Sequence, residues 1–266
     1  MADTSSSPIA TLFPGYFALV MATGIVAIGA NQQNLDLLAQ ILYVITVLAY
    51  VVLAVLLASR MIRYWSNFAA DVTNHAKGFA FLTTVAATNV LASASIVIHG
   101  WRNLAWALWW ASLVLWAAFV YTTLIAVVTD RDKPGLQGGI NGSWFLLTVS
   151  TQSIAVVAGL FLTRTDSDAL AFIAIAAFAL GVVLYLIVMT MVFLRWTFHP
   201  LDPTEADPPA WIAAGAVAIT VLAGSNILLA ADQATDRVAR LAPFLEGLVV
   251  TAWATATFWF PLMIAI

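Results

Sequence analysis

The stretch NGSWFLLTVSTQSIAVVAGLFL, from Asn141 to Leu162, contains no charged side chain. It is long enough to cross a bilayer, because roughly 20 helical residues span the hydrocarbon core. About two fifths of its positions hold Gly, Ser, Thr, Asn or Gln, side chains that gain nothing from facing lipid. On a helix, Phe145, Thr148, Gln152 and Gly159 share one face. We therefore predict that this segment lines a transport path and that similar segments recur.

The composition places the chain among integral membrane proteins. Of its 266 residues, 63% are hydrophobic and 9% are charged, against about 25% charged in soluble domains. A net charge of −3 argues against a nucleic-acid partner, which requires a basic face. The absence of cysteine excludes disulfides and thiolate chemistry. We expect an all-α protein in contact with the lipid bilayer.

The chain offers no recognisable metal, cofactor or catalytic site. Its three histidines, His75, His99 and His199, have no metal-ligand spacing with one another or with acids. No zinc-protease, phosphate-loop or serine-hydrolase motif is present. We therefore predict no cofactor, no bound metal and no enzymatic activity.

Hydropathy predicts eight spans in a single transmembrane domain. All ten Lys and Arg residues fall outside these spans, as expected when a basic residue at a helix centre costs about 2.5–3.5 kcal/mol. The spans lie near residues 13–30, 37–59, 78–98, 104–128, 141–162, 169–194, 211–231 and 244–266.

The distribution of basic residues predicts the orientation. Three alternate loops hold six Lys or Arg, and the loops on the opposite side hold four. The positive-inside rule then places the N-terminus in the cytoplasm. We predict a multi-pass protein of the plasma or inner membrane.

The spans alternate in character. Gly, Ser, Thr, Asn and Gln are more than twice as frequent in the odd spans as in the even spans. This alternation indicates a repeat of helical hairpins. Its simplest interpretation is an inner set of polar helices surrounded by apolar, lipid-facing helices. The alternative is that the small residues serve only close helix packing.

The odd spans supply the candidate pore-lining residues. Any single hydroxyl among them is well explained by a bond to a carbonyl of its own helix, so the prediction depends on the whole set. The candidates are Tyr16, Thr23 and Gly24; Thr84, Thr88, Asn89 and Ser95; Phe145, Thr148, Gln152 and Gly159; and Thr220 and Gly224.

Glu246 is the only acid inside a predicted span, about one turn from its start. An intramembrane carboxylate is a candidate proton-coupling site. An interfacial carboxylate near a helix N-terminus is the competing interpretation.

A path lined by hydroxyls, amides and aromatics would bind ions weakly. The spans contain no buried base for an anion and no ring of acids for a cation. Weak binding favours throughput, which suits a channel or a low-affinity carrier.

Four segments, in order along the chain, carry a resemblance to a known family. They are FPGYFALVMATGIVAIG (13–29), NGSWFLLTVSTQSIAVV (141–157), PPAWIAAGAVAITVLAG (208–224) and WATATFWFPL (253–262). The chain from about residue 12 to its end resembles the tellurite-resistance/dicarboxylate transporter family. That family includes the bacterial protein TehA, fungal malate permeases and plant slow-type anion channels.

The resemblance implies ten helices in five hairpins, with odd helices forming the pore and even helices surrounding it, often in homotrimers. It implies passage of small inorganic anions, C4-dicarboxylates such as malate, or efflux of tellurite or sulfite. The matching positions are Phe13 to Gly24, Asn141 to Ser153 and Trp211 to Gly224.

One feature departs from the family pattern. The family's ninth helix carries the phenylalanine that plugs the pore, and this sequence of eight spans has no segment for it. We expect a fragment, a shortened member completed by a partner, or a protein that is not a working pore. A gate residue is not assigned.

Two other functional classes compete with transport. A membrane enzyme acting on lipid or a quinone would need acids, histidines or a metal converging at one membrane face, and the loops show no such group. A binding or assembly subunit without transport is the other alternative.

Overall fold

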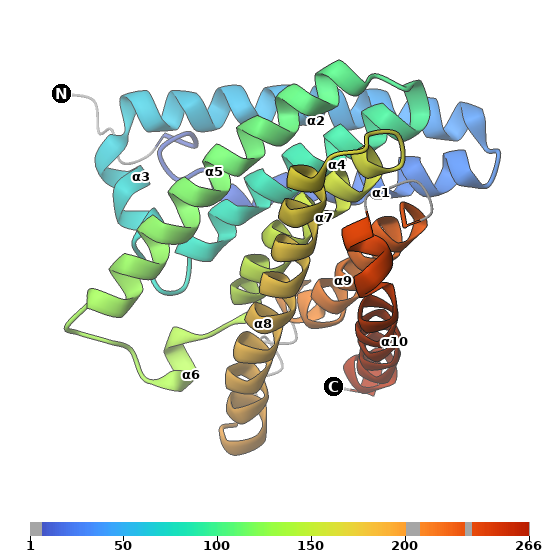
Figure 1. Ribbon diagram of the computed structural model, residues 1–266. Coiled ribbons are helices and arrows are strands. Elements are labelled where there is room, and N and C mark those ends of the chain that lie inside the picture. The colour runs from blue at the N-terminus through green and yellow to red at the C-terminus, as the bar shows by residue number, and fades with distance from the viewer. Residues whose placement is uncertain (1–6, 201–207, 232–235, 266) are drawn as a thin grey trace. The chain divides into compact units, whose positions relative to one another are not determined.

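The computed structural model describes residues 7–200, 208–231 and 236–265 (Figure 1). These residues form α-helices and 3-10 turns without any strand, so the all-α prediction is confirmed for the described chain. Eight helical segments among them are long and apolar enough to cross a membrane, as predicted. They are Pro14–Gln32, Asp36–Arg63, Gly78–His99, Arg102–Thr129, Gly142–Leu162, Asp168–Phe198, Ile212–Leu229 and Arg237–Ala265.

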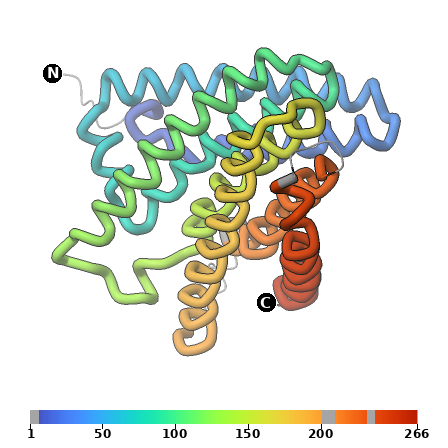
Figure 2. The backbone as a smooth tube through the Cα atoms, in the orientation of Figure 1, coloured from blue at the N-terminus to red at the C-terminus, as the bar shows by residue number. Residues whose placement is uncertain are grey.

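The chain divides into two compact units, Met1–Lys133 and Pro134–Ile266. In the first unit, α1 packs against α2 and α4, and α4 packs against α5 (Figures 1 and 2). Its elements are η2 (Pro14–Phe17), α1 (Ala18–Gln32), α2 (Asp36–Arg63), α3 (Trp65–Val72), η3 (Gly78–Phe81), α4 (Leu82–His99) and α5 (Arg102–Thr129).

The second unit repeats this arrangement. Here α7 packs against α8 and α9, and α9 packs against α10. Its elements are α6 (Leu136–Gly139), η4 (Gly142–Phe145), α7 (Leu146–Leu162), α8 (Asp168–Phe198), η6 (Pro208–Trp211), α9 (Ile212–Leu229) and α10 (Asp236–Ala265). We call α1, α4, α7 and α9 the inner helices, and α2, α5, α8 and α10 the outer helices.

Every inner helix begins with a four-residue 3-10 turn that ends in an aromatic residue. The turns read PGYF, GFAF, GSWF and PPAW, and they start at Pro14, Gly78, Gly142 and Pro208. The regular spacing of these starts along the chain defines the length of the hairpin repeat. Proline suits this first turn because the missing N–H has no partner there in any case.

The inner helices approach each other closely where a glycine removes a side chain. A Cβ on Gly24 of α1 would lie 2.5 Å from Val90 of α4. A Cβ on Gly159 of α7 would lie 2.8 Å from the Cβ of Asn226 and 3.0 Å from its backbone in α9. Small residues therefore set the spacing of the inner helices, as is common where dispersion rather than hydrophobicity drives helix association.

Burial separates the two classes of helix. The spanning segments of the inner helices α1, α4, α7 and α9 are 39%, 78%, 94% and 50% buried, whereas those of the four outer helices are between 11% and 33% buried. The polar odd spans are thus the covered ones, and the apolar even spans present their side chains outward, as the alternation predicted.

The outer helices are longer than the predicted spans, so they include arginines that the prediction placed outside. Arg60 near the end of α2 is buried, and it donates hydrogen bonds to the carbonyls of Ala10 (3.1 Å) and Leu12 (2.8 Å). It also pairs with the Asp71 carboxylate of α3. Arg195 near the end of α8 likewise donates to the Gln137 carbonyl (3.0 Å). In both units, therefore, an arginine of an outer helix donates hydrogen bonds to the backbone of the segment that precedes an inner helix.

The Arg60–Asp71 pair also involves Lys77, whose ammonium lies 3.1 Å from Asp71 Oδ1. Burial opposes ionisation of this carboxyl. The hydrogen bonds and positive charges of Arg60 and Lys77 outweigh it, and they hold the pKa of Asp71 below its ordinary value.

We predict that Gly159→Ala loosens the contact between α7 and α9. The added Cβ meets backbone atoms that cannot rotate away, so we expect a loss of about 1–3 kcal/mol of stability and a lower midpoint of thermal unfolding in detergent. Gly247→Ala is the matched control, because a Cβ there meets nothing within 4 Å. Equal midpoints for the two variants would contradict this account.

We predict that Asp71→Asn destabilises the protein at neutral pH by roughly 1–2 kcal/mol. This is less than the loss for a fully buried ion pair, because Asp71 retains some solvent contact. A carboxyl with a lowered folded-state pKa stabilises above its unfolded value of 3.8 and loses that contribution as the pH falls further. The difference in unfolding midpoint between wild type and Asp71→Asn should therefore shrink below about pH 4. Asp132→Asn, in an exposed connection, is the control.

Candidate functional site

The uncharged segment 141–162 forms η4 and α7, and the local sequence explains where the helix begins. Asn141 accepts a hydrogen bond from the Ser143 amide (2.9 Å) through its side-chain oxygen, which caps the 3-10 turn. The Trp144 indole donates to the Gly139 carbonyl (3.1 Å) and ties the turn to α6. From Ser143 to Gly159 every residue of this segment is buried.

The predicted polar face of α7 packs against two neighbouring helices. The ring of Phe145 lies 5.8 Å from that of Tyr185 in α8. Gln152 Nε2 donates to the Phe178 carbonyl of α8 (3.1 Å), and Gly181 leaves the space that this amide occupies. Farther along the helix, Gly159 faces α9.

Two polar atoms on this face have no hydrogen-bond partner. They are the hydroxyl oxygen of Thr148 and the side-chain carbonyl oxygen of Gln152, both in side chains with no solvent exposure. The two residues are one helical turn apart and lie on the same face. An unsatisfied buried polar group costs about 1–3 kcal/mol, so this pair is unusual within a packed helix.

Other threonine hydroxyls on the inner helices donate to backbone carbonyls of the same segment. This is the alternative that the sequence analysis gave for any single hydroxyl. Thr84 donates to the Phe81 carbonyl (2.7 Å), Thr88 to the Thr84 carbonyl (2.7 Å) and Thr220 to the Ala216 carbonyl (2.9 Å). These back-bonds remove the donor from further use. Thr148 differs from them because its hydroxyl makes no such bond.

In the first unit the candidate residues are paired with hydroxyls of the outer helices. The Tyr50 hydroxyl of α2 lies 2.9 Å from the Thr88 hydroxyl, and the Tyr43 hydroxyl lies 2.9 Å from the Ser95 hydroxyl. The Ser112 hydroxyl of α5 donates to the side-chain oxygen Oδ1 of Asn89 (2.8 Å).

Sequence reasoning missed these outer-helix partners, because the even spans were treated as purely apolar. Thr46 belongs with them, since its hydroxyl donates to that of Thr23 (3.0 Å) next to Gly24. The available signal was the spacing of Tyr43, Thr46 and Tyr50, which puts three polar groups on one face of an otherwise apolar helix.

Three other candidates lie apart from this hydrogen-bonded set. Tyr16 is exposed and makes an edge contact with Phe13, at a ring distance of 6.0 Å. Gly224 gives room to Phe178 and Val249 from the outer helices. Glu246 is exposed, and it lies well inside α10 rather than one turn from its start, because the helix begins at Asp236.

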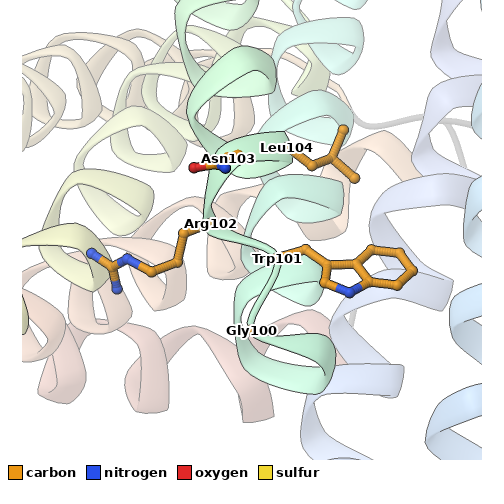
Figure 3. A pocket seen from close by; sticks show the side chains of 5 residues that line it. All are labelled: Gly100, Trp101, Arg102, Asn103 and Leu104. Carbon is orange, nitrogen blue, oxygen red and sulfur yellow. The ribbon is translucent and has the colours of Figure 1, made fainter.

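An open hollow lies at the turn between α4 and α5 (Figure 3). Gly100 ends α4 in the left-handed conformation (φ +69°), and its amide donates to the Ile96 carbonyl (2.9 Å). Figure 3 shows Trp101 and Leu104 pointing to one side of the turn and Arg102 to the other. His99 stacks on Trp101 at 4.4 Å. This arrangement is typical of an aromatic anchor at the membrane surface.

Comparisons with known proteins place the chain in a family. The family described as voltage-dependent anion channel matches residues 11–266. The chain belongs to the voltage-dependent anion channel family. The resemblance to TehA-like proteins noted from four sequence segments is thereby confirmed, and the family is one of membrane anion transport.

Similar proteins give further context. An uncharacterized membrane protein of Mycobacterium tuberculosis (strain H37Rv) is 43% identical over 76 residues, 29% of this chain and 34% of that protein. An uncharacterized transporter of Methanocaldococcus jannaschii is 24% identical over 228 residues, 83% of this chain and 65% of that protein. No solved structure matches the chain. Since the chain covers about a third of the first relative and less than two thirds of the second, the activity, substrates and partners of a whole protein are proposals.

Proposed function

We propose that this channel-family protein passes anions along its inner helices and that Thr148 and Gln152 contact the permeating ion. The observation that carries the proposal is the unpartnered hydroxyl of Thr148 on α7, in a buried segment without any charge. Family membership is the reason for proposing an anion as the solute.

The chemistry of the pair suits transient contact with an anion. A threonine hydroxyl donates one hydrogen bond, and the second N–H of the Gln152 amide is a further donor beside the one held by Phe178. Neutral donors replace part of an anion's hydration shell without the deep binding that a buried arginine would create. Weak binding lets the ion leave as easily as it enters.

The substrate class includes small inorganic anions, C4-dicarboxylates such as malate, and tellurite- or sulfite-type oxyanions. We further propose a plasma or inner membrane location with the N-terminus in the cytoplasm, supported by the six-to-four distribution of basic residues between alternate loops. A homotrimer is proposed on the family resemblance alone.

Anion flux through the purified chain in liposomes tests the function. Chloride, nitrate and malate would be compared at imposed membrane potentials. Potential-driven flux with a graded preference among the three is the expected result. No flux of any anion from well-folded protein would overturn the proposal and favour a binding or assembly subunit.

Thr148→Val keeps the side-chain shape and removes the hydroxyl. We predict that it lowers anion flux by about fivefold to tenfold, which corresponds to the loss of one hydrogen bond of roughly 1 kcal/mol in the ion's path. Thr148→Ser should retain most of the flux. Thr190→Val is the matched control, because Thr190 is exposed on α8 and back-bonds to the Leu186 carbonyl. A flux unchanged in Thr148→Val would remove this residue from the path.

Glu246→Gln separates a proton-coupled carrier from a channel. Because the side chain is exposed on an outer helix, we predict that the substitution leaves flux and its dependence on a pH gradient unchanged. The measurement is malate uptake into liposomes with and without an imposed pH gradient. Loss of the gradient effect in the variant would restore Glu246 as a coupling residue.

A further inference from the structure

The outer helix α8 holds the Gln152 amide of α7 in one orientation. Gln152 Nε2 donates to the Phe178 carbonyl of α8 at 3.1 Å. An amide oxygen accepts hydrogen bonds and cannot donate one, so the reverse orientation would place two carbonyl oxygens against each other. The amide nitrogen therefore stays on the side of α8, and the amide oxygen is the end that has no partner.

A glycine on α8 provides the space for this amide. A Cβ on Gly181 would lie 2.5 Å from Gln152 Nε2 and 2.6 Å from Gln152 Cδ. Such a contact is too short to be tolerated, so any side chain at this position would displace the amide. One turn farther along α8, the ring of Tyr185 packs against that of Phe145, which lies on the same face of α7. The position of this face is thus set by α8.

The orientation brings a donor and an acceptor together on one face of α7. The Thr148 hydroxyl can donate a hydrogen bond, whereas the Gln152 oxygen can only accept one. Both atoms are buried and unpartnered. Residues four apart on a helix are neighbours, with about 5–6 Å between their Cβ atoms, so one small solute can reach both groups.

These two groups treat different anions differently. An anion without a hydrogen-bond donor can accept from Thr148, but it leaves the Gln152 oxygen unpaired and faces the negative end of that carbonyl dipole. A hydroxycarboxylate can satisfy both groups, since its carboxylate accepts from Thr148 and its hydroxyl donates to Gln152. A site that hydrogen-bonds a solute hydroxyl rejects the analogue that lacks it, because a buried polar atom of the site is then left unpaired.

We propose that Gln152 is a specificity-determining residue that favours anions carrying a hydroxyl group over anions without a hydrogen-bond donor. Gly181 is the positioning residue that keeps the amide oxygen available to the solute. This inference rests on the proposed function, and it adds an acceptor to the donors already described for the same site.

Malate and succinate test this selectivity, because both carry two carboxylates and they differ by one hydroxyl. Flux of each into liposomes would be measured at the same imposed membrane potential. We expect malate flux to exceed succinate flux by about fivefold or more. Gln152→Met keeps the length of the side chain and removes the amide, so in this variant we expect the ratio to fall towards one.

Gly181→Ala separates positioning from chemistry, because it removes no polar group. The added Cβ displaces the Gln152 amide, so the malate-to-succinate ratio should fall here as well. Gly215→Ala is the matched control and should keep the wild-type ratio, since a Cβ at that position meets nothing within 4 Å. Gel filtration checks that each variant is folded, and Gln152→Met decides the matter if Gly181→Ala is not.

The possible failures can be told apart. Equal flux of malate and succinate in the wild type would overturn this inference and leave the proposed anion transport standing. An unchanged ratio in Gln152→Met, or chloride flux without malate flux, would do the same. Absence of flux for chloride, nitrate, malate and succinate alike would overturn the proposed function, and the inference with it.

Discussion

The bilayer provides no hydrogen bonds, so the polar groups of this chain must find partners inside the protein. The inner helices carry many hydroxyls and amides, and the structure satisfies most of the candidate groups in one of two ways. Thr84, Thr88 and Thr220 return their hydroxyl protons to their own helix. Ser95 and Asn89 are met by side chains from outer helices. Against this background the unpartnered hydroxyl of Thr148 differs from those of the other buried candidate threonines and serines.

The same constraint explains the arginines. A buried guanidinium requires several acceptors, and Arg60 finds them in the carbonyls of Ala10 and Leu12 and in the carboxylate of Asp71. Arg60 lies at the end of α2, so its side chain reaches the carbonyls of Ala10 and Leu12. These carbonyls precede η2 and lie outside any helix. Arg195 does the same for Gln137 in the second unit. The hairpin repeat is therefore held at its ends by charge-assisted hydrogen bonds and along its length by glycine-mediated close packing.

Neutrality of the inner helices has a functional consequence. A site made of hydroxyl and amide groups stabilises an ion by less than its full hydration energy, so occupancy is brief. A charged side chain in the site would bind the ion more tightly. The basic residues of the chain lie instead at helix ends and in connections. An anion path built in this way favours rate over affinity, which is consistent with a family of channels.

The sequence by itself determined the class of fold and which helices are covered and which face outward. Long apolar runs predict membrane spans because lipid tolerates little else, and the excess of small and polar residues in alternate spans identified the covered helices. The segment 141–162 was singled out by composition, and it is the most buried of the described spans. Family membership also followed from four segments in order.

Only the tertiary structure decided which polar atoms are engaged. Helical spacing put Thr148 and Gln152 on one face, but it could not show that the Gln152 amide reaches the Phe178 carbonyl while its oxygen and the Thr148 hydroxyl remain unpaired. The roles of Tyr43, Tyr50 and Ser112 were likewise hidden, because hydrogen bonds between residues far apart in the sequence depend on how the helices pack. Glu246 lies farther into its helix than the apolar run indicated, since α10 begins at Asp236. Periodicity fixes a face within one helix, whereas the partner of that face is set by packing between helices, which no local pattern encodes.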